Sequence, residues 1–132
     1  PPKGLEKIDE SGAVVGTWGE GPLGVYCMKR PGGTEVTLVN AQNGQKTQIY
    51  QGPDGMTNPC LSNEGNTVVV SHLNADKTVT FWAAQDTDGF KPRKIAENYW
   101  PATTRISHNG QVVCLYQGPS KGLVLIKLEP PK

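Results

Sequence analysis

Apolar residues recur along the chain in short runs of four to eight residues, rich in Val, Thr, Tyr, Trp and Ile. Gly, Pro and Asn separate these runs, and no window of a dozen residues keeps the i, i+3, i+4, i+7 spacing of a helix. Short β-type runs between turn residues are typical of strands. The sequence therefore predicts an all-β domain, with strands at residues 4–8, 12–18, 24–30, 34–40, 46–51, 58–62, 67–73, 78–84, 91–96, 102–107, 111–117 and 122–128.

Residues 61–84 carry the clearest pattern, with three short strands and a turn between each pair. Because side chains alternate along a strand, Val68 and Val70 share one face of its central strand, and Val69 and Ser71 share the other. Apolar residues on both faces are expected of a sheet that packs between two neighbours.

Two other places in the chain repeat this pattern. The repeated pattern is a strand end followed by three polar residues, a Gly and then two valines. It occurs three times, with 53–54 residues between the first and second copies and 44–45 between the second and third. This period is typical of propeller blades or another repeated β unit. Within a single domain of residues 1–132, we predict three repeats at about residues 4–52, 57–98 and 102–128.

The alignment of the repeats brings out a set of ring-bearing side chains. The alignment matches Val68 with Val112. An aromatic residue or a His lies four residues after the first valine of each copy. Two further aromatic residues lie in the link between the second and third copies. Such rings either fill gaps between the units or stack on sugars and anchor a partner protein. The candidate contact residues are Trp18, His72, Tyr116, Tyr99 and Trp100.

The residues at 62–70, Ser-Asn-Glu-Gly-Asn-Thr-Val-Val-Val, followed by Thr-Val-Thr-Phe-Trp at 78–82, resemble a blade of β-propeller proteins. The pattern looks most like TolB-like, lactonase-like and WD40-like repeats, in which a polar turn ending in Gly precedes the second strand. This resemblance implies three imperfect four-stranded antiparallel repeats in a partial propeller. Known propellers close with four or more blades, whereas this chain supplies at most three, the last without its outer strand. A β-trefoil or other pseudo-threefold β fold, a β-sandwich and an irregular β fold remain alternatives.

Charge and hydropathy exclude several classes of function. The formal net charge is +1, and the 13 basic and 12 acidic residues are scattered singly, so no nucleic-acid partner is expected. The longest aliphatic run, residues 123–126, is too short to span a bilayer, so no membrane partner is expected either. No charged-then-apolar leader opens the chain. We expect a cytoplasmic protein, or a component of a virus particle assembled in the cytoplasm.

No motif predicts catalysis, a metal or a cofactor. The three cysteines, an odd number, lie inside predicted strands and are expected to be reduced, buried thiols. His72 and His108 are the only histidines, and neither stands in a zinc-binding spacing. Residues 19–24 spell G-x-G-x-x-G, but a strand follows instead of the helix that a phosphate site requires, which indicates a hairpin turn. Residues 86–89, Asp-Thr-Asp-Gly, lack the later ligands of a calcium loop and predict a polar turn.

These observations favour a non-catalytic structural or binding module. We expect it to assemble through β edges and apolar faces, with itself as a homo-oligomer or with a larger particle, such as a decoration subunit on a viral capsid. The alternatives are a lectin-like carbohydrate-binding module and a fragment of a propeller-type hydrolase.

Overall fold

The computed structural model describes residues 14–18, 21–30, 33–52, 59–99, 103–117 and 122–128, and the backbone alone for residues 14–18 and 29–30. The described residues form eleven strands and one short 3-10 turn. The predicted strands are confirmed to within three residues at each end, and the one predicted at residues 4–8 lies outside the described residues. The elements are β1 (Val14–Trp18), β2 (Leu23–Arg30), β3 (Gly33–Asn40), β4 (Lys46–Gly52), β5 (Cys60–Leu61), β6 (Thr67–Leu73), β7 (Val79–Gln85), the 3-10 turn Asp86–Asp88, β8 (Arg93–Tyr99), β9 (Thr103–Ile106), β10 (Val112–Tyr116) and β11 (Leu123–Lys127).

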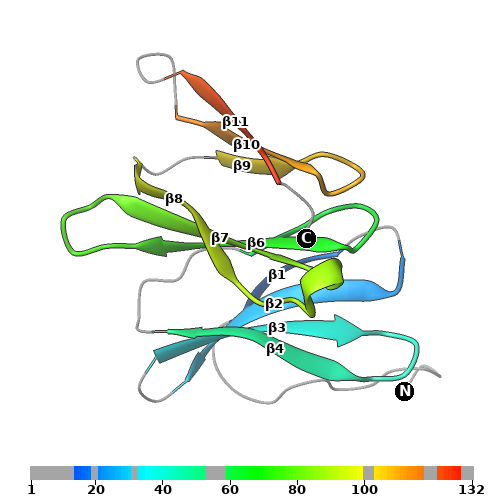
Figure 1. Ribbon diagram of the computed structural model, residues 1–132. Helices are drawn as coiled ribbons and strands as arrows, with labels where there is room; N and C mark the ends of the chain where they lie inside the picture. The colour runs from blue at the N-terminus through cyan, green and yellow to red at the C-terminus, as the bar shows by residue number, and fades with distance from the viewer. Residues whose placement is uncertain are drawn as a thin grey trace.

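The strands form three antiparallel sheets, each built from consecutive strands. The first sheet has the order β1-β2-β3-β4, the second β5-β6-β7-β8 and the third β9-β10-β11. Figure 1 shows them stacked one above another, with the second sheet between the other two. The predicted all-β fold with three repeats is therefore confirmed, and within the described ranges the third repeat has no fourth strand, as the sequence indicated.

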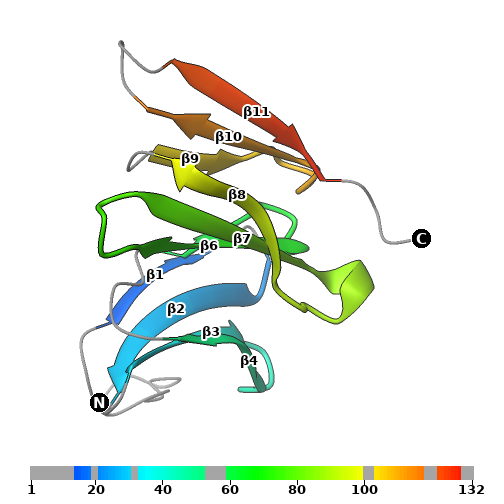
Figure 2. The same cartoon turned by 60° about the vertical axis from the view of Figure 1, so that its left-hand side comes forward.

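The first strands of the three sheets lie together on one side of the stack. The two-residue strand β5 contacts both β1 and β9, and it also contacts β2. The view in Figure 2, turned by 60°, shows the same three layers. The sheets therefore share an inner side, where their first strands meet.

The first apolar core fills the space between the first and second sheets. Alternation along β2 turns Val25 and Cys27 toward this core and Tyr26 and Met28 toward the opposite face of the first sheet. The buried residues of this core are Val25, Cys27, Val36, Leu38, Ile49, Leu61, Val68, Val70 and Ala84.

The second core lies between the second and third sheets. Its largest side chain is Phe81, which is 1% exposed and whose burial stabilises the fold by about 2–3 kcal/mol. Its buried residues are Val69, Val79, Phe81, Ala83, Ala96, Val113, Leu115 and Leu128. The second sheet is therefore apolar on both faces, as the alternation at residues 68–71 predicted.

Two equivalent turns show that the predicted alignment of the second and third repeats is wrong by one residue. The N–H of Ser62 donates to the carbonyl of Thr67 (2.9 Å), and the N–H of Ser107 donates to the carbonyl of Val112 (2.8 Å). The turns thus match Thr67 with Val112, so the predicted match of Val68 with Val112 is wrong by one residue. Because neighbouring residues of a strand point to opposite faces, this difference exchanges the two faces of the strand that follows.

The same turns lock the second and third sheets together. The Thr67 hydroxyl donates to the carbonyl of Gly110 (2.8 Å), and the side-chain amide of Asn66 donates to the carbonyl of Asn109 (2.8 Å). Gly110 has a φ of +76°, and a Cβ added there would contact the side chain of Asn66 and lie 2.6 Å from Thr67 Oγ1. A glycine is therefore required here both by its backbone conformation and by the close approach of the neighbouring sheet.

We predict that Gly110→Ala destabilises the fold by at least about 2 kcal/mol, since it adds steric overlap between two sheets to the strain of a left-handed alanine. Gly89→Ala is the matched control, because Gly89 has a φ of +62° but a Cβ added to it would meet nothing within 4 Å. The control should cost only about 1 kcal/mol. Urea unfolding of the two variants measures the difference, and equal losses of stability would contradict the interlocking role of Gly110.

Candidate functional site

The third sheet has one covered face and one open face. Val113 and Leu115 of β10 point into the second core and are 0% exposed. Cys114 and Tyr116 alternate with them and point away, and they pair across the ladder with Leu125 and Leu123. We call this second side the outer face of the third sheet. By register it carries Thr103, Arg105, Val112, Cys114, Tyr116, Leu123, Leu125 and Lys127.

The outer face concentrates the exposed apolar surface of the molecule. Leu123 is 60% exposed, Leu125 is 64% exposed and Tyr116 is 44% exposed. Among the described residues only one other large apolar side chain is exposed, Leu73 at 38%. A contiguous exposed apolar patch on a globular domain marks a place where another surface packs.

The second sheet shows what the same face looks like when it is covered. The second and third sheets each pack one face against the preceding sheet. The opposite face of each sheet is the one on which a following sheet would pack, and we call it the offered face. In the second sheet this offered face carries Val69, Phe81 and Ala83, all at most 1% exposed because the third sheet lies on them. On the third sheet the offered face is the outer face, and its leucines lie in solvent. The outer face is thus a packing surface of the repeat without a neighbour among the described residues.

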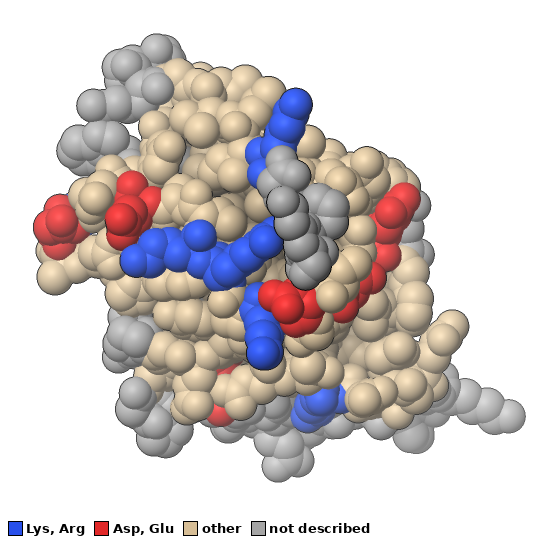
Figure 3. Space-filling model, in the orientation of Figure 1, with Lys and Arg blue, Asp and Glu red and all other residues tan. Residues whose placement is uncertain are grey.

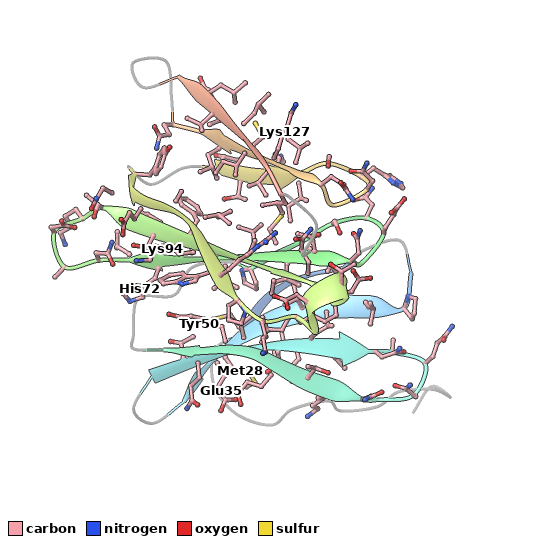
Figure 4. The ribbon with its side chains drawn as sticks, viewed as in Figure 1. Met28, Glu35, Tyr50, His72, Lys94 and Lys127 are labelled. Atoms are coloured by element: carbon pink, nitrogen blue, oxygen red, sulfur yellow. The ribbon has the colours of Figure 1, made fainter. Side chains whose placement is uncertain are left out.

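Charge is sparse and of one sign on the outer face. Its only ionisable side chains with a full charge at neutral pH are Arg105 and Lys127, both exposed. Lys127 lies on β11, the last strand of the third sheet (Figure 4). Figure 3 shows a different face of the molecule from the outer face. It has a short band of basic side chains across its middle and acidic side chains on either side. A partner of the outer face would therefore be apolar at its centre and acidic at its rim.

Tyr116 and Tyr99, two of the predicted contact residues, have different surroundings. Tyr116 lies on the outer face beside Leu123, its partner in the ladder. Tyr99, at the end of β8, packs edge-on against Phe81 with the ring centroids 6.4 Å apart. Tyr99 is thus a half-buried side chain at the margin of the second core, and it does not join Tyr116 in one site.

The remaining predicted contact residues are not placed beside Tyr116. His72 is half-buried on β6, on the face that the second sheet turns to the first, with its Nδ1 3.2 Å from Asn74 Oδ1. The one-residue difference in alignment explains why His72 and Tyr116 stand on opposite kinds of face. Trp18 ends β1, where its backbone pairs with Gly24. β1 is the first strand of its sheet, whereas His72 and Tyr116 lie on the second strands of theirs, so the predicted equivalence of Trp18 with these two residues is wrong. The side chain of Trp18 and the whole of Trp100 lie outside the described residues.

Sequence reasoning missed two features, one on the outer face and one between the first and second sheets. Leu123 and Leu125 provide most of the exposed apolar surface, although β11 was predicted as a strand. The signal was present in its sequence, Leu-Val-Leu-Ile-Lys, which is apolar on both faces even though it ends the last repeat. An aromatic contact between Tyr50 and Trp82, with centroids 5.1 Å apart, also joins the first and second sheets. Tyr50 points from β4 toward the second sheet in Figure 4.

The three cysteines are free thiols in different environments. Cys27 is buried in the first core, and burial raises its pKa. Burial also raises the pKa of half-buried Cys60, an effect that the positive charge of Arg105 partly offsets. Cys114 is half-buried on the outer face. The predicted buried, reduced state thus describes Cys27 best.

Within the described ranges, no three His, Cys, Asp or Glu residues are grouped so that they could hold a metal ion. In the same part of the chain, no helix has the length and apolar character needed to cross a membrane. A hollow of about 120 Å³, open to solvent, is lined by Leu23, Leu38, Asn40, Gln45 and Thr47.

Solved structures with a similar fold are β-propellers. The propeller domain of the Trilobed protease from Pyrococcus furiosus matches with a TM-score of 0.65 and 13% identity, over 86% of this chain and 39% of that one. TolB from Acinetobacter baumannii matches with 0.60 and 12%, over 90% and 33%. Pyrococcus horikoshii acylaminoacyl peptidase matches with 0.57 and 12%, over 83% and 18%. No protein-family model and no curated protein sequence matches the chain.

These similarities establish the fold of the chain. The predicted resemblance to propeller-type repeats is confirmed, and the three sheets are blades of a partial β-propeller rather than parts of a trefoil or a sandwich. The chain spans less than half the length of each of these structures. At identities of 12–13%, the similarity concerns the fold alone.

We predict that Cys114 is alkylated first by iodoacetamide at neutral pH, at least about tenfold faster than Cys27, because thiolate formation and access both limit the reaction. The raised pKa of Cys27 and Cys60 keeps these two thiols protonated until the pH exceeds the ordinary thiol range, so their labelling accelerates most at alkaline pH. Mass spectrometry of peptides from a timed reaction measures the order. Fastest labelling of Cys27 would contradict the placement of Cys114 on an open face.

Proposed function

We propose that the chain is a non-catalytic binding or assembly module whose partner packs on the outer face of the third sheet. The observation that supports this most directly is the contrast between two equivalent faces. Leu123 and Leu125 are 60% and 64% exposed, whereas Phe81 on the corresponding face of the second sheet is 1% exposed. Covering an exposed leucine contributes about 1.5–3 kcal/mol, so the outer face holds enough apolar surface to drive association.

A second copy of the chain is one such partner, and the far side of the first sheet bears on how two copies would meet. Met28 and Val39 on that side are only 1% and 2% exposed, so the chain already covers them. Figure 4 shows Met28 and Glu35 below the first sheet, away from the second. Stacking this side onto the outer face of another copy would require it to be uncovered first. The outer faces of two copies would therefore pack on each other around a twofold axis, and a larger particle would use the same face.

The second candidate function is that of a propeller segment in a longer hydrolase, with the chemistry elsewhere. It is supported by the similarity to the propeller domain of a protease and to a peptidase, of which this chain spans 39% and 18%. In that case another blade would cover the outer face. The carbohydrate-binding alternative has less support, since Tyr116, Tyr99 and His72 lie in separate places. Turnover of a peptide or lactone substrate, abolished by a single side-chain change, would overturn the non-catalytic proposal.

We predict that Tyr116→Lys weakens self-association at least tenfold, because it places a charge beside Leu123 in the apolar part of the outer face. A tenfold loss equals about 1.4 kcal/mol. Light scattering over a range of protein concentrations measures the mass. Leu73→Lys is the matched control, since Leu73 is an exposed apolar residue outside the third sheet. The control should associate like the native chain. A native chain that stays monomeric at all concentrations would rule out self-assembly through this face.

A further inference from the structure

Two turns of the chain share the tripeptide Asn-Gly-Gln, at residues 43–45 and 109–111. An Asn that precedes a Gly is prone to cyclise, because the glycine has no side chain to hinder the attack of its nitrogen on the Asn side chain. The product is a succinimide. Both asparagines are exposed, and the two glycines have similar left-handed φ values of +72° and +76°. The two turns are therefore a matched pair of reactive sites.

The local hydrogen bonds of the two turns are also alike. In each turn the N–H of the Gln donates to the side-chain oxygen of the Asn, over 2.9 Å at Asn43 and 3.1 Å at Asn109. In each turn the N–H of the Gly donates to a carbonyl earlier in the turn, over 2.7 Å at Gly44 and 2.9 Å at Gly110. What each turn provides by itself thus differs little between the two sites.

The neighbouring sheet distinguishes them. The carbonyl of Asn109 accepts from Asn66, and the carbonyl of Gly110 accepts from Thr67, both over 2.8 Å. Within the described residues, no hydrogen bond joins the turn at Asn43 to another sheet. Cyclisation requires rotation about the Cα–C bond of the Asn, so that the next nitrogen reaches Cγ. At Asn109 this rotation would turn both carbonyls away from the second sheet, so the docked third sheet opposes the reaction.

We propose that Asn109 is a modification site, at which isoaspartate forms when the third sheet separates from the second and then keeps the two sheets apart. In the separated state the nitrogen of Gly110 bonds to Cγ of Asn109, its proton passes to water, and the side-chain nitrogen leaves as ammonia. Water then adds to one carbonyl of the succinimide and breaks the bond of that carbonyl to the Gly110 nitrogen. Attack on the side-chain carbonyl gives Asp, and attack on the main-chain carbonyl gives isoaspartate.

Isoaspartate changes the backbone as well as the charge. The main chain then runs through Cβ and Cγ of residue 109, which lengthens the turn, and the former main-chain carbonyl becomes a carboxylate on a side branch. The carbonyl that accepts from Asn66 is thus lost from the main chain, and Gly110 is displaced. Gly110 fits closely against the second sheet, since a Cβ added to it would lie 2.6 Å from Thr67 Oγ1. The longer turn is therefore incompatible with the docked arrangement.

The rates at the two sites of one chain test the protection of Asn109. The native chain is incubated at neutral pH, and mass spectrometry of its peptides measures Asp and isoaspartate at both sites over time. Asn43 should convert at least about tenfold faster than Asn109, because the third sheet must open locally before Asn109 reacts. In denaturing urea the two rates should agree within about twofold, since unfolding removes the second sheet from both. Equal rates in the native chain, or the same inequality in urea, would overturn the proposal.

A variant that weakens the docking tests the cause of the protection. Thr67→Val removes the hydroxyl that donates to Gly110, so conversion at Asn109 should accelerate about fivefold and conversion at Asn43 should not change. Thr34→Val is the matched control, because Thr34 is also buried but lies on the first sheet, at the end of β3 away from the Asn43 turn. It should leave both rates unchanged. An unchanged rate at Asn109 in folded Thr67→Val would contradict the proposal.

If Thr67→Val does not fold, urea below the unfolding transition replaces it. Such urea raises the population of locally opened states. Conversion at Asn109 in the native chain should then rise with urea, while conversion at the exposed Asn43 turn stays nearly constant. A rate at Asn109 that does not respond to urea until the chain unfolds would overturn the proposal.

The effect of the modification is tested on chains that already carry it. Asn43→Ser removes the faster site, and incubation of this variant in urea, refolding and ion-exchange chromatography yield chains with isoaspartate at position 109. Cys60 reports the separation of the sheets, because this half-buried thiol packs against the second core and its strand contacts β9. Its alkylation by iodoacetamide should be at least about tenfold faster than in unmodified Asn43→Ser, whereas Cys27 in the first core should keep its rate.

Asn109→Asp separates the effect of the charge from that of the longer backbone. It introduces the carboxylate without lengthening the turn, and the carboxylate oxygens still accept from Ser107 Oγ and the N–H of Gln111. Cys60 of this variant should react as in the native chain. Equally fast alkylation of Cys60 in Asn109→Asp would show that the charge alone separates the sheets and would overturn the role of the backbone. Native reactivity of Cys60 in the isoaspartate chain would overturn the proposed separation.

Discussion

The architecture depends on face-to-face packing of sheets that are apolar on both sides. In the second sheet, Val68 and Val70 point into one core and Val69 into the other, and all three are at most 1% exposed. A sheet of this kind is stable only between two neighbours, because either face left in water would expose a row of apolar side chains. The stacking of the three sheets, the position of both cores and the exposure of the last face all follow from this constraint.

The polar turns make the stacking specific. Hydrophobic faces alone would allow neighbouring sheets to slide, since apolar contacts have little directionality. The hydrogen bonds from Asn66 and Thr67 to the turn that contains Gly110 fix one arrangement of the second and third sheets. The cost of burying these groups is offset locally, because the Ser62 hydroxyl accepts from the Thr67 N–H (3.1 Å) and donates to Asn66 Oδ1 (2.7 Å). Within the described residues, no buried side-chain nitrogen or oxygen lacks a partner.

The third sheet presents an apolar surface that no described residue covers. Leu123 and Leu125 on the outer face are 60% and 64% exposed, whereas the corresponding face of the second sheet lies under the third sheet. Any apolar surface of matching shape would cover these leucines. The propeller-type fold does not identify the partner, since such folds carry many functions. The position of the outer face nevertheless restricts where such a surface would pack.

The sequence by itself determined the strands, their grouping into three repeats and the two-sided apolar character of the middle sheet. These features are local, because a two-residue alternation and a turn motif need no knowledge of distant residues. Only the tertiary structure showed which residues of the third repeat point into the core and which point outward. The hydrogen bonds of the turns at Ser62 and Ser107 shift the alignment by one residue, and one residue reverses a strand. Tertiary packing also decided that Tyr99 supports a core, whereas Leu123 and Leu125 lie exposed beside Tyr116. Exposure depends on whether another sheet lies above a residue, which no local pattern records.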